Sequence, residues 1–228
     1  GPNLLELIKI ADVVFWPCAA DFKYEHVRNY PDGFIDLCFY NGGIRNSEQE
    51  EVARLLRQKS KSLIAYGQCA VDGGIPALAN LKTVKGIYNA SYHDNPSIDN
   101  PGGVEPQPVT PSECGDLEIP KFYPQVLRLK DVVPVDYEIP GCPPQADRVW
   151  EAILALAGGQ VPLQNRNVKV ACYDKAVCDE CKLEKRQVRI KEFKRVHTSI
   201  PEPGWCLLEQ GYLCVGPATR SGCGALCP

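Results

Sequence analysis

The chain has 228 residues, of which 44% are hydrophobic and 23% charged, enough to bury the core of one large domain or of a domain with an appendage. Its net charge of −3 gives no global attraction to nucleic acid or to an anionic membrane. The longest apolar run falls far short of the roughly 20 residues of a spanning helix, so we expect a soluble chain with no membrane span and no nucleic-acid partner. Without a methionine or a visible signal peptide, the chain reads as an internal segment of a longer protein.

The first part of the chain alternates short apolar runs with amphipathic stretches. This pattern predicts a helix over residues 4–8, followed by short strands over 13–16 and 34–40. Ser47 has Glu50 three residues later, which is the capping-box arrangement at the start of a helix.

Two more strands are predicted over 62–66 and 135–139, and an amphipathic helix over 144–157. Near-continuous apolar strands that alternate with helices indicate a parallel sheet covered on both faces, and hence an α/β fold. Ligands bind at the carboxyl ends of the strands in such sheets. Cys69 and Cys142 each follow a predicted strand, so both are expected at that edge.

The pattern changes near residue 160, where we expect the first domain (1–160) to end and a second one (161–228) to begin. The second part shows little periodicity and holds seven of the twelve cysteines. We therefore expect that something other than a hydrophobic core organises it. Residues 91–120 are rich in Pro, Gly, Asn and Asp and are expected to form a long surface loop.

The strongest group of cysteines is Cys178-x-x-Cys181 with Cys206 and Cys214. Four thiolates can hold either a zinc ion or an iron–sulfur cluster. Zinc ribbons usually close with a second C-x-x-C, whereas Cys206 and Cys214 are eight residues apart. The spacing favours a cluster and leaves zinc open.

Two further pairs of cysteines are candidates. Cys223 and Cys227 begin another set, whose remaining members would lie beyond the end of this sequence; the alternative is a terminal disulfide or a loose tail. Cys69 and Cys142 lie in Gly/Pro-rich turns, where backbone can approach a bulky ligand closely. Together they suggest a cofactor at the edge of the sheet.

The remaining cysteines have structural interpretations or none. Cys38 lies in an apolar strand and is expected to be packed there, and packing is also favoured for Cys18. Cys114 and Cys172 are assigned no role.

The segments GQCAVDGGIP, PGCPP, VCDEC and CLLEQGYLCVGPATRSGCGALCP, in this order, resemble the small subunit of cytoplasmic [NiFe] hydrogenases. The run CFYNGGIRNSEQEEVARLLRQKS is most similar to the methyl-viologen-reducing (deazaflavin-non-reducing) branch associated with heterodisulfide reductase. The resemblance covers essentially the whole chain.

The resemblance implies a flavodoxin-like first domain that carries a proximal [4Fe–4S] cluster. Cys69 and Cys142 match two of its ligands, and the remaining C-x-x-C pair would lie upstream of Gly1. Some relatives use an aspartate as one ligand, and Asp21 is the candidate here; the alternative is an ordinary loop or cap carboxylate.

The second domain, on the same resemblance, would carry two more clusters, which makes three in the full-length chain. Cys178, Cys181, Cys206 and Cys214 match the complete distal set. Cys223 and Cys227 match the beginning of the medial set.

The resemblance also implies a function without catalytic residues in this chain. Hydrogen would be split in a [NiFe] large subunit, and this chain would pass electrons to an acceptor such as a [2Fe–2S] linker protein and heterodisulfide reductase, in the cytoplasm. Three alternatives are the same type of subunit in a formate-oxidising or other non-hydrogenase complex, a zinc-stabilised interaction module, and the cluster-bearing subunit of respiratory complex I. The cysteine-rich region over 172–227 argues against the last.

A basic segment follows the C-x-x-C motif. Residues 182–197 contain seven Lys and Arg against two Glu. This segment is either a docking face for an acidic electron acceptor or a solvated surface. His26, His93 and His197 show no metal-binding spacing.

Overall fold

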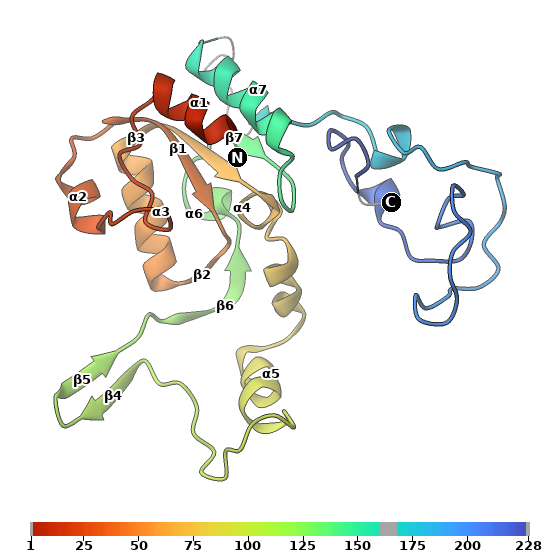
Figure 1. Cartoon of the computed structure of the whole chain (residues 1–228). Helices are drawn as coiled ribbons and strands as arrows, with labels where there is room; N and C mark the ends of the chain where they lie inside the picture. Colours follow the sequence, from red (N-terminus) through yellow and green to blue (C-terminus); the bar gives the residue numbers. More distant parts are fainter. Residues whose placement is uncertain (1, 160–167, 227–228) are drawn as a thin grey trace. The chain divides into compact units, whose positions relative to one another are not determined.

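The computed structural model describes residues 2–159 and 168–226 (Figure 1). The α-helices are α1 (Pro2–Ile10), α2 (Tyr24–Asn29), α3 (Ser47–Lys59), α4 (Gln68–Asp72), α5 (Val84–Tyr88), α6 (Leu129–Val132) and α7 (Ala146–Ala157). The strands are β1 (Ile35–Asn41), β2 (Ile44–Asn46), β3 (Ser60–Tyr66), β4 (Val109–Ser112), β5 (Gly115–Glu118), β6 (Phe122–Leu127), β7 (Tyr137–Ile139) and β8 (Val168–Lys169). Short 3₁₀ and π turns are η1 (Ile75–Leu81), η2 (Asn89–His93), η3 (Val177–Asp179) and η4 (Gly216–Ala218). Over these described ranges, no helix combines the length and the apolarity needed to cross a membrane.

The described residues form two compact units. The first contains residues 2–143 with 168–169, and the second contains 144–159 with 170–226. Helix α7 thus belongs to the second unit and strand β8 to the first. The division into domains at residue 160 stays a prediction.

The first unit is built on a parallel sheet with the strand order β1-β3-β7-β8. Cys38 of β1 lies opposite Leu63 of β3, and Ile64 of β3 lies opposite Tyr137 of β7. The predicted α/β fold with a parallel sheet is therefore confirmed. Because the strands are parallel, the residues that follow β3 and β7 meet at one edge.

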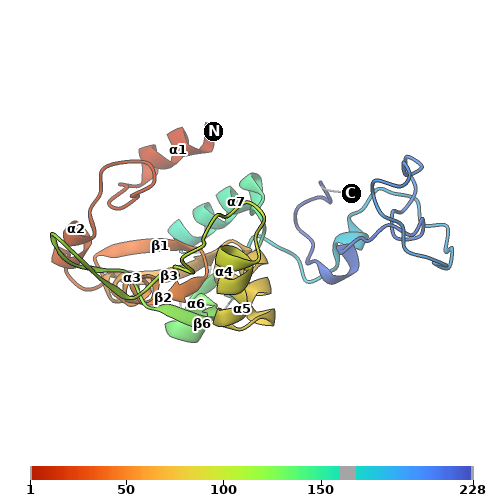
Figure 2. The ribbon, with the colours of Figure 1, turned by 90° about the horizontal axis from the view of Figure 1, so that it is seen from below.

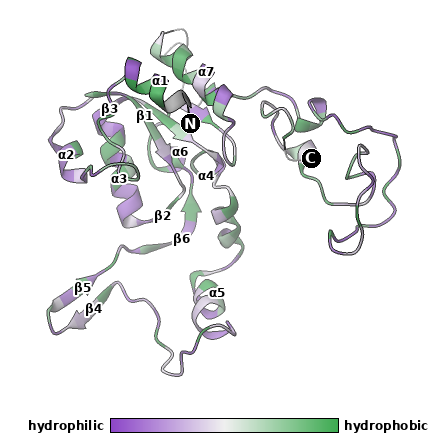
Figure 3. Cartoon of the chain, viewed as in Figure 1, coloured by the Kyte–Doolittle hydropathy of each residue, from purple (hydrophilic) through white to green (hydrophobic). Residues whose placement is uncertain are grey.

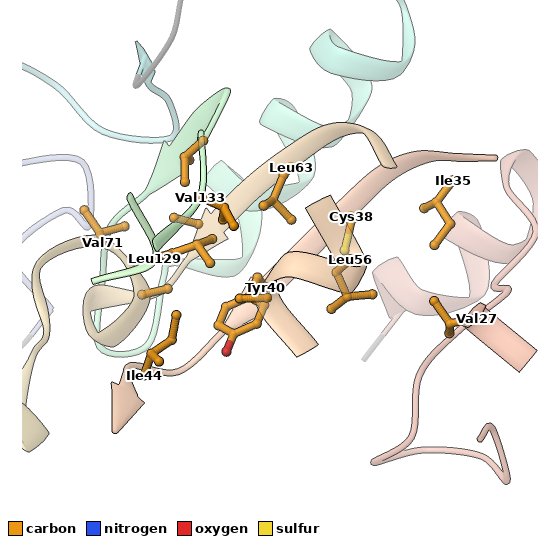
Figure 4. Packing of buried hydrophobic residues seen from close by; sticks show 14 residues of the cluster. Val27, Ile35, Cys38, Tyr40, Ile44, Leu56, Leu63, Val71, Leu129 and Val133 are labelled. Carbon is orange, nitrogen blue, oxygen red and sulfur yellow. The ribbon is translucent and has the colours of Figure 1, made fainter. Parts of the chain in front are cut away.

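Strand β3 is buried along most of its length because it lies between two other strands and both of its faces are covered. Leu63, Ile64 and Ala65 are consecutive and fully buried. Leu63 belongs to the same core cluster as Leu56 of α3 and Val133, as Figure 4 shows. Helix α3 packs against β1 and β3 in both views (Figures 1 and 2). Truncation of a buried leucine such as Leu63 to alanine costs about 2–5 kcal/mol of stability.

An ion pair with additional backbone hydrogen bonds joins β3 to the segment before β7. Asp136 Oδ2 accepts a hydrogen bond from the Leu63 N–H at 2.8 Å and another from Arg57 Nη1 at 2.5 Å. Arg57 also donates to the carbonyl of Ser60 at 2.7 Å. A half-buried ion pair with these backbone contacts fixes the alignment of the strands that precede the Cys69 and Cys142 turns.

The N-cap of helix α3 lies one residue before Ser47, the residue that the capping-box pattern predicts. The N-cap is Asn46, whose side-chain oxygen accepts the backbone N–H three residues later at 2.9 Å. Ser47 is the first helical residue, and its hydroxyl accepts a hydrogen bond from the Lys121 N–H at 3.0 Å. Both residue types cap helices well, so the pattern alone does not choose between neighbours.

The predicted strand over 13–16 is wrong. This segment has no regular secondary structure and no strand partner among the described residues, and Val13 and Trp16 are exposed. The Val14 carbonyl accepts a hydrogen bond from the Tyr30 hydroxyl at 3.1 Å instead. An apolar run becomes a strand only where a neighbouring strand satisfies its backbone groups.

An arm leaves the sheet after α4 and returns at β6. It contains η1, α5, η2 and the antiparallel hairpin of β4 and β5, which extends away from the sheet in Figure 1. The hairpin lies inside the segment 91–120, for which the composition predicts a surface loop, and its residues are exposed. The surface position is confirmed, and the hairpin is an addition that the composition does not indicate.

Candidate functional site

Four cysteines of the second unit line one small cavity, namely Cys178, Cys181, Cys206 and Cys214. Cys178 lies in η3, and Cys181 donates its backbone N–H to the carbonyl of Val177 at 3.0 Å. The structure thus brings together the four cysteines that the spacing grouped.

The rest of this cavity is mostly apolar. Its lining includes Val177, Leu183, Leu207, Leu208 and Pro217. A hydrophobic shell around thiolates limits access of water and thereby tunes the properties of a bound metal group. The donor set and its surroundings suit a metal cofactor that is partly shielded from water.

Gly216 gives this cavity room on one side. A Cβ atom at this position would lie 3.4 Å from the sulfur of Cys178 and 3.4 Å from that of Cys214. The Gly216 N–H also donates to Cys214 Sγ at 3.5 Å. Backbone amides that point at ligand sulfurs are a means of tuning iron–sulfur centres.

The four thiols surround the cavity and do not meet at a point. Within residues 2–159 and 168–226, no three His, Cys, Asp or Glu side chains gather as closely as a single metal ion requires. In a four-cysteine zinc site every sulfur lies about 2.3 Å from one ion. In a [4Fe–4S] cluster each thiolate binds its own iron atom, so the sulfurs are spread wider.

Backbone hydrogen bonds hold the cysteine segments together in place of regular secondary structure. The Cys206 N–H donates to the carbonyl of Glu184 at 2.9 Å, and the Val177 N–H donates to that of Thr219 at 2.8 Å. Lys185 Nζ donates to the carbonyl of Cys178 at 2.6 Å. The two backbone bonds link residues far apart in the sequence, which explains why periodicity gives no signal here.

Two polar side chains that the sequence patterns missed also order this unit. Glu209 accepts the Arg186 N–H at 2.8 Å and the indole N–H of Trp205 at 2.8 Å. These hydrogen bonds lower the pKa of the Glu209 carboxyl below its usual value, the indole contact being the largest cause. Gln210 is buried and bonds to the backbone of Glu202 in both directions, at 2.7 and 3.1 Å.

The side chain of Glu180 links the C-x-x-C motif to the backbone on both sides of Cys223. Glu180, between Cys178 and Cys181, accepts the N–H groups of Gly222 at 2.9 Å and Gly224 at 3.0 Å. Cys227, the other predicted member of this set, lies outside the described residues.

Cys69 and Cys142 follow neighbouring parallel strands, as the sequence predicts. The Gly67 N–H donates to the carbonyl of Ile139 at 2.8 Å, and the Gln68 N–H to that of Gly141 at 2.7 Å. These bonds hold the two cysteine turns side by side at the edge of the sheet. Cys69 is half-buried and Cys142 is exposed, and the Cys142–Pro143 peptide bond is cis.

Asp21 is exposed and forms an ion pair with Lys23. In the part of the chain that the structure describes, no hydrogen bond or ion pair brings Asp21 to Cys69 or Cys142. Its assignment as a cluster ligand therefore stays a prediction.

The cysteines without a proposed role divide by exposure. Cys38 is buried in β1, and this burial raises the pKa of its thiol, so the expected packing is confirmed. Cys18 is exposed, so the expected packing of that residue is wrong; it lies in the loop whose strand prediction also failed. Cys114 is exposed in the turn of the β4–β5 hairpin.

The basic segment 182–197 is largely exposed. Arg186 is neutralised within the unit by Glu184 at 2.9 Å and Glu202 at 3.0 Å. Arg189 and Lys191 are exposed, and the described ion pairs include neither of them. Part of the positive charge is therefore directed to solvent.

Comparison with protein families gives one match to the larger part of the chain. Residues 1–156 match the family described as "NADH ubiquinone oxidoreductase, 20 Kd subunit". This range contains the parallel sheet with Cys69 and Cys142, and it ends before the cysteine-rich region.

Curated relatives extend the likeness over the cysteine-rich region. The chain is 40% identical to an iron–sulfur subunit of the F420-non-reducing hydrogenase of Archaeoglobus profundus, over 99% of this chain and 71% of the relative. It is 42% identical to a subunit of the F420-non-reducing hydrogenase of Methanocaldococcus jannaschii, over 99% of this chain and 70% of the relative.

A solved structure agrees with this likeness. It is described as "Crystal structure of NAD+-reducing [NiFe]-hydrogenase in the H2-reduced state", with a TM-score of 0.59 and 28% identity. The alignment covers 71% of this chain and 82% of that one. The fold is flavodoxin-like in its first part, and the chain belongs to the family of iron–sulfur subunits of F420-non-reducing hydrogenases.

Proposed function

We propose that this chain carries electrons from a hydrogen-oxidising [NiFe] subunit to an acceptor subunit by means of [4Fe–4S] clusters. The observation that carries the proposal is the cavity lined by Cys178, Cys181, Cys206 and Cys214, in a chain of a hydrogenase iron–sulfur subunit family. Four thiols spread around an apolar cavity suit a polynuclear group better than a single zinc ion.

The residues that would hold the clusters fall into three sets. The distal set is the four-cysteine cavity. A proximal set would include Cys69 and Cys142, with Asp21 as a further candidate, and a medial set would include Cys223 and Cys227. A [4Fe–4S] cluster at any of these sites would supply a one-electron redox centre.

The chain's own contribution at the distal set is to bind, shield and tune. The thiolates would ligate iron, and the apolar side chains that line the cavity would keep water away. The Gly216 N–H, which already donates to Cys214 Sγ, would withdraw charge from that sulfur. We assign no catalytic residue to this chain.

The proposed electron acceptor is a [2Fe–2S] linker protein that leads to heterodisulfide reductase, as the resemblance of residues 38–60 implies. The exposed part of the basic segment 182–197 would steer an acidic acceptor toward the distal set. Steering by exposed charges weakens as salt is added, which makes this part of the proposal testable.

The proposal is tested by metal analysis of the purified native complex. Iron, acid-labile sulfide and zinc are measured in the unaltered complex and in Cys206→Ser, with Cys114→Ser as a matched exposed control. We expect iron and sulfide in the unaltered complex, a loss of about four iron atoms per chain in Cys206→Ser, and no loss in Cys114→Ser.

Two alternatives have their own outcomes. Zinc without sulfide would establish the zinc-stabilised interaction module and refute the electron-transfer proposal. If the clusters are reduced by formate and not by H₂, the partner is a formate-oxidising subunit.

A further inference from the structure

Arg45, the middle residue of β2, is held inside the first unit by contacts with its neighbours. Its guanidinium lies 4.4 Å from the ring centroid of Phe122, and Nη1 donates to Asn80 Oδ1 at 3.3 Å. Asn80 is itself fixed by two hydrogen bonds with the backbone of Val126, at 2.8 and 3.1 Å. The position of the Arg45 head is therefore set by its surroundings and not by solvent.

One edge of this guanidinium has no partner. Nε and Nη2 are both buried, and neither has a hydrogen-bond acceptor among the residues that the structure describes. These two nitrogens form the edge that binds a carboxylate through two parallel hydrogen bonds. The described chain also offers Arg45 no ion pair, and its burial lowers the pKa of the guanidinium. A buried cation with two unused donors calls for an anion.

The unpaired edge belongs to a residue that lines a cavity of ≈ 380 Å³. Most of the cavity wall is apolar and is formed by Pro76, Ala79, Ile87, Phe122 and Val126. A free inorganic anion would leave this apolar wall wet. A carboxylate on a short hydrocarbon stem, such as an Asp or Glu side chain, would contact the apolar wall with its stem. Its two oxygens would accept hydrogen bonds from Nε and Nη2 of Arg45.

The element beside the cavity carries an exposed apolar ridge. Pro76 and Ala79 of η1 line the cavity, whereas Ile75, Leu78 and Leu81 of the same turn are 70%, 63% and 84% exposed. Residues three apart lie on one side of a 3₁₀ helix, so these side chains form a continuous ridge. Figure 3 shows η1, between α4 and α5, as a mainly hydrophobic segment. Such a ridge marks a protein contact.

The ridge starts next to one of the candidate cluster ligands. Ile75 follows Gly74, where a Cβ atom would lie only 2.9 Å from Cys69 Sγ. A protein that covers the ridge would therefore also reach the edge of the sheet that carries Cys69 and Cys142.

We infer that the hydrogen-oxidising partner subunit packs on the Ile75–Leu78–Leu81 ridge and inserts an acidic side chain into the cavity. The Arg45 side chain then turns, so that Nε and Nη2, which are buried in this structure, bind the inserted carboxylate. The inference rests on the proposed function, which supplies this partner. The positively charged Nε and Nη2 edge of Arg45 provides charge complementarity to a carboxylate, and the ridge provides the apolar area that a stable interface needs.

The test is a zero-length cross-link in the assembled complex. Arg45→Lys places an amine near the inserted carboxylate, and a carbodiimide joins the two as an amide that peptide mass spectrometry identifies. The matched control is Arg54→Lys, because Arg54 pairs with Glu50 of this chain at 2.7 Å on the surface. We expect position 45 to link to an Asp or Glu of the hydrogen-oxidising subunit, and position 54 to link to Glu50.

A second variant covers the case in which a change at Arg45 disturbs folding. Leu78→Glu alters an exposed side chain and should weaken retention of the partner, with Leu117→Glu on the exposed hairpin as control. Arg45→Gln, where it folds, should weaken that retention about thirtyfold, because it removes one partner of a buried charge pair.

Three results would overturn the inference. These are the absence of an inter-subunit link at position 45 while the control links, a link to a different subunit, and unchanged retention in Leu78→Glu. If iron, sulfide and H₂-dependent reduction are normal in such a preparation, the proposed function stands and only the inference about Arg45 fails.

Discussion

Glu180 holds the backbone on both sides of Cys223, because its Oε2 atom accepts the N–H of Gly222 at 2.9 Å and that of Gly224 at 3.0 Å. Glu180 is one of the two residues between Cys178 and Cys181. One carboxylate thus connects the four-cysteine cavity with the next candidate ligand. Hydrogen bonds to an ionised acceptor are stronger than those between neutral groups.

Glu180→Ala should release the turn around Cys223 without removing any thiol. The loss of two charge-assisted hydrogen bonds should cost about 1.5–3 kcal/mol, borne by the local order of residues 222–224. We expect altered electron paramagnetic resonance of one cluster in the reduced complex, while the signal assigned to the Cys178 set persists. Glu184→Ala, which breaks an exposed pair with Arg186, is the control and should leave every signal unchanged.

Gly216 should be intolerant of a branched side chain. A Cβ atom there only touches the sulfurs of Cys178 and Cys214, at 3.4 Å, so Gly216→Ala should retain iron. Gly216→Val adds two methyl groups inside the cavity and should lower the iron content by about four atoms per chain. Ala218→Val, in the same 3₁₀ turn, is the control. Equal iron content in all three variants would show that the cavity does not hold the cluster.

The parallel sheet was predictable because its evidence is local. The core strands β1, β3 and β7 are short apolar runs that end in Gly-rich turns, and the order of strands and helices then limits the topology. The placement of Cys69 and Cys142 at one edge followed from that. The run over 13–16 had the same composition but lacks a partner strand, which composition cannot reveal.

For the second unit, the cysteine spacing predicted which cysteines come together, and little else of its structure could be predicted. Its order comes from long-range backbone bonds, such as that between Cys206 and Glu184, and these leave no periodic signal. The roles of Glu180 and Glu209 are equally hidden, because any exposed glutamate has the same pattern. A carboxylate inside the C-x-x-C motif is the one signal that could have pointed to Glu180, and Asp179 shares it.

Gly74→Ala should disturb the Cys69 turn by direct contact. Gly74 has φ of +56°, and a Cβ atom would lie 2.9 Å from Cys69 Sγ and 3.1 Å from its backbone nitrogen. Gly115→Ala is the matched control, because φ is +111° and nothing lies within 4 Å. Both substitutions should cost about 1–3 kcal/mol in backbone strain. Only Gly74→Ala should also change the spectrum of the proposed proximal cluster. If both variants give the same spectrum as the unaltered chain, Cys69 is not a ligand of that cluster.

Tyr40 should make the fold sensitive to alkali. Burial raises the pKa of Tyr40 to about 12, and its hydroxyl donates to the carbonyl of Gln49 at 3.3 Å. The unfolded chain would ionise near pH 10, so the contribution is complete below that pH and is lost as pH rises toward 12. Over this window the free energy of unfolding should fall by about 2–3 kcal/mol.

Tyr40→Phe removes the ionisable group and should flatten this decline. The measurement is the denaturant midpoint of both proteins at several pH values from about 8 to 12. The difference between the two curves should change only above about pH 10. A constant difference over the whole range would show that Tyr40 ionises equally well in the folded chain.

The exposed basic residues of the segment 182–197 should control the rate at which charged acceptors are reduced. Arg189 and Lys191 are exposed, whereas Arg186 is neutralised by Glu184. The double variant Arg189→Glu and Lys191→Glu reverses the local field without touching a cysteine. At low salt, H₂-dependent reduction of an anionic acceptor such as ferricyanide should slow about tenfold, and reduction of a cationic viologen should not slow.

The control for this charge reversal changes the same number of charges elsewhere, with Lys9→Glu on α1 and Lys61→Glu near the start of β3, both exposed and away from the Ile75–Leu78–Leu81 ridge. It should alter neither rate, and adding salt should erase the effect at the basic segment because exposed charges are screened over about 10 Å at 0.1 M. If both acceptors slow equally, the substitutions act on the cluster site itself. If neither slows, electrons leave the chain at another surface, and the segment 182–197 is only a solvated face.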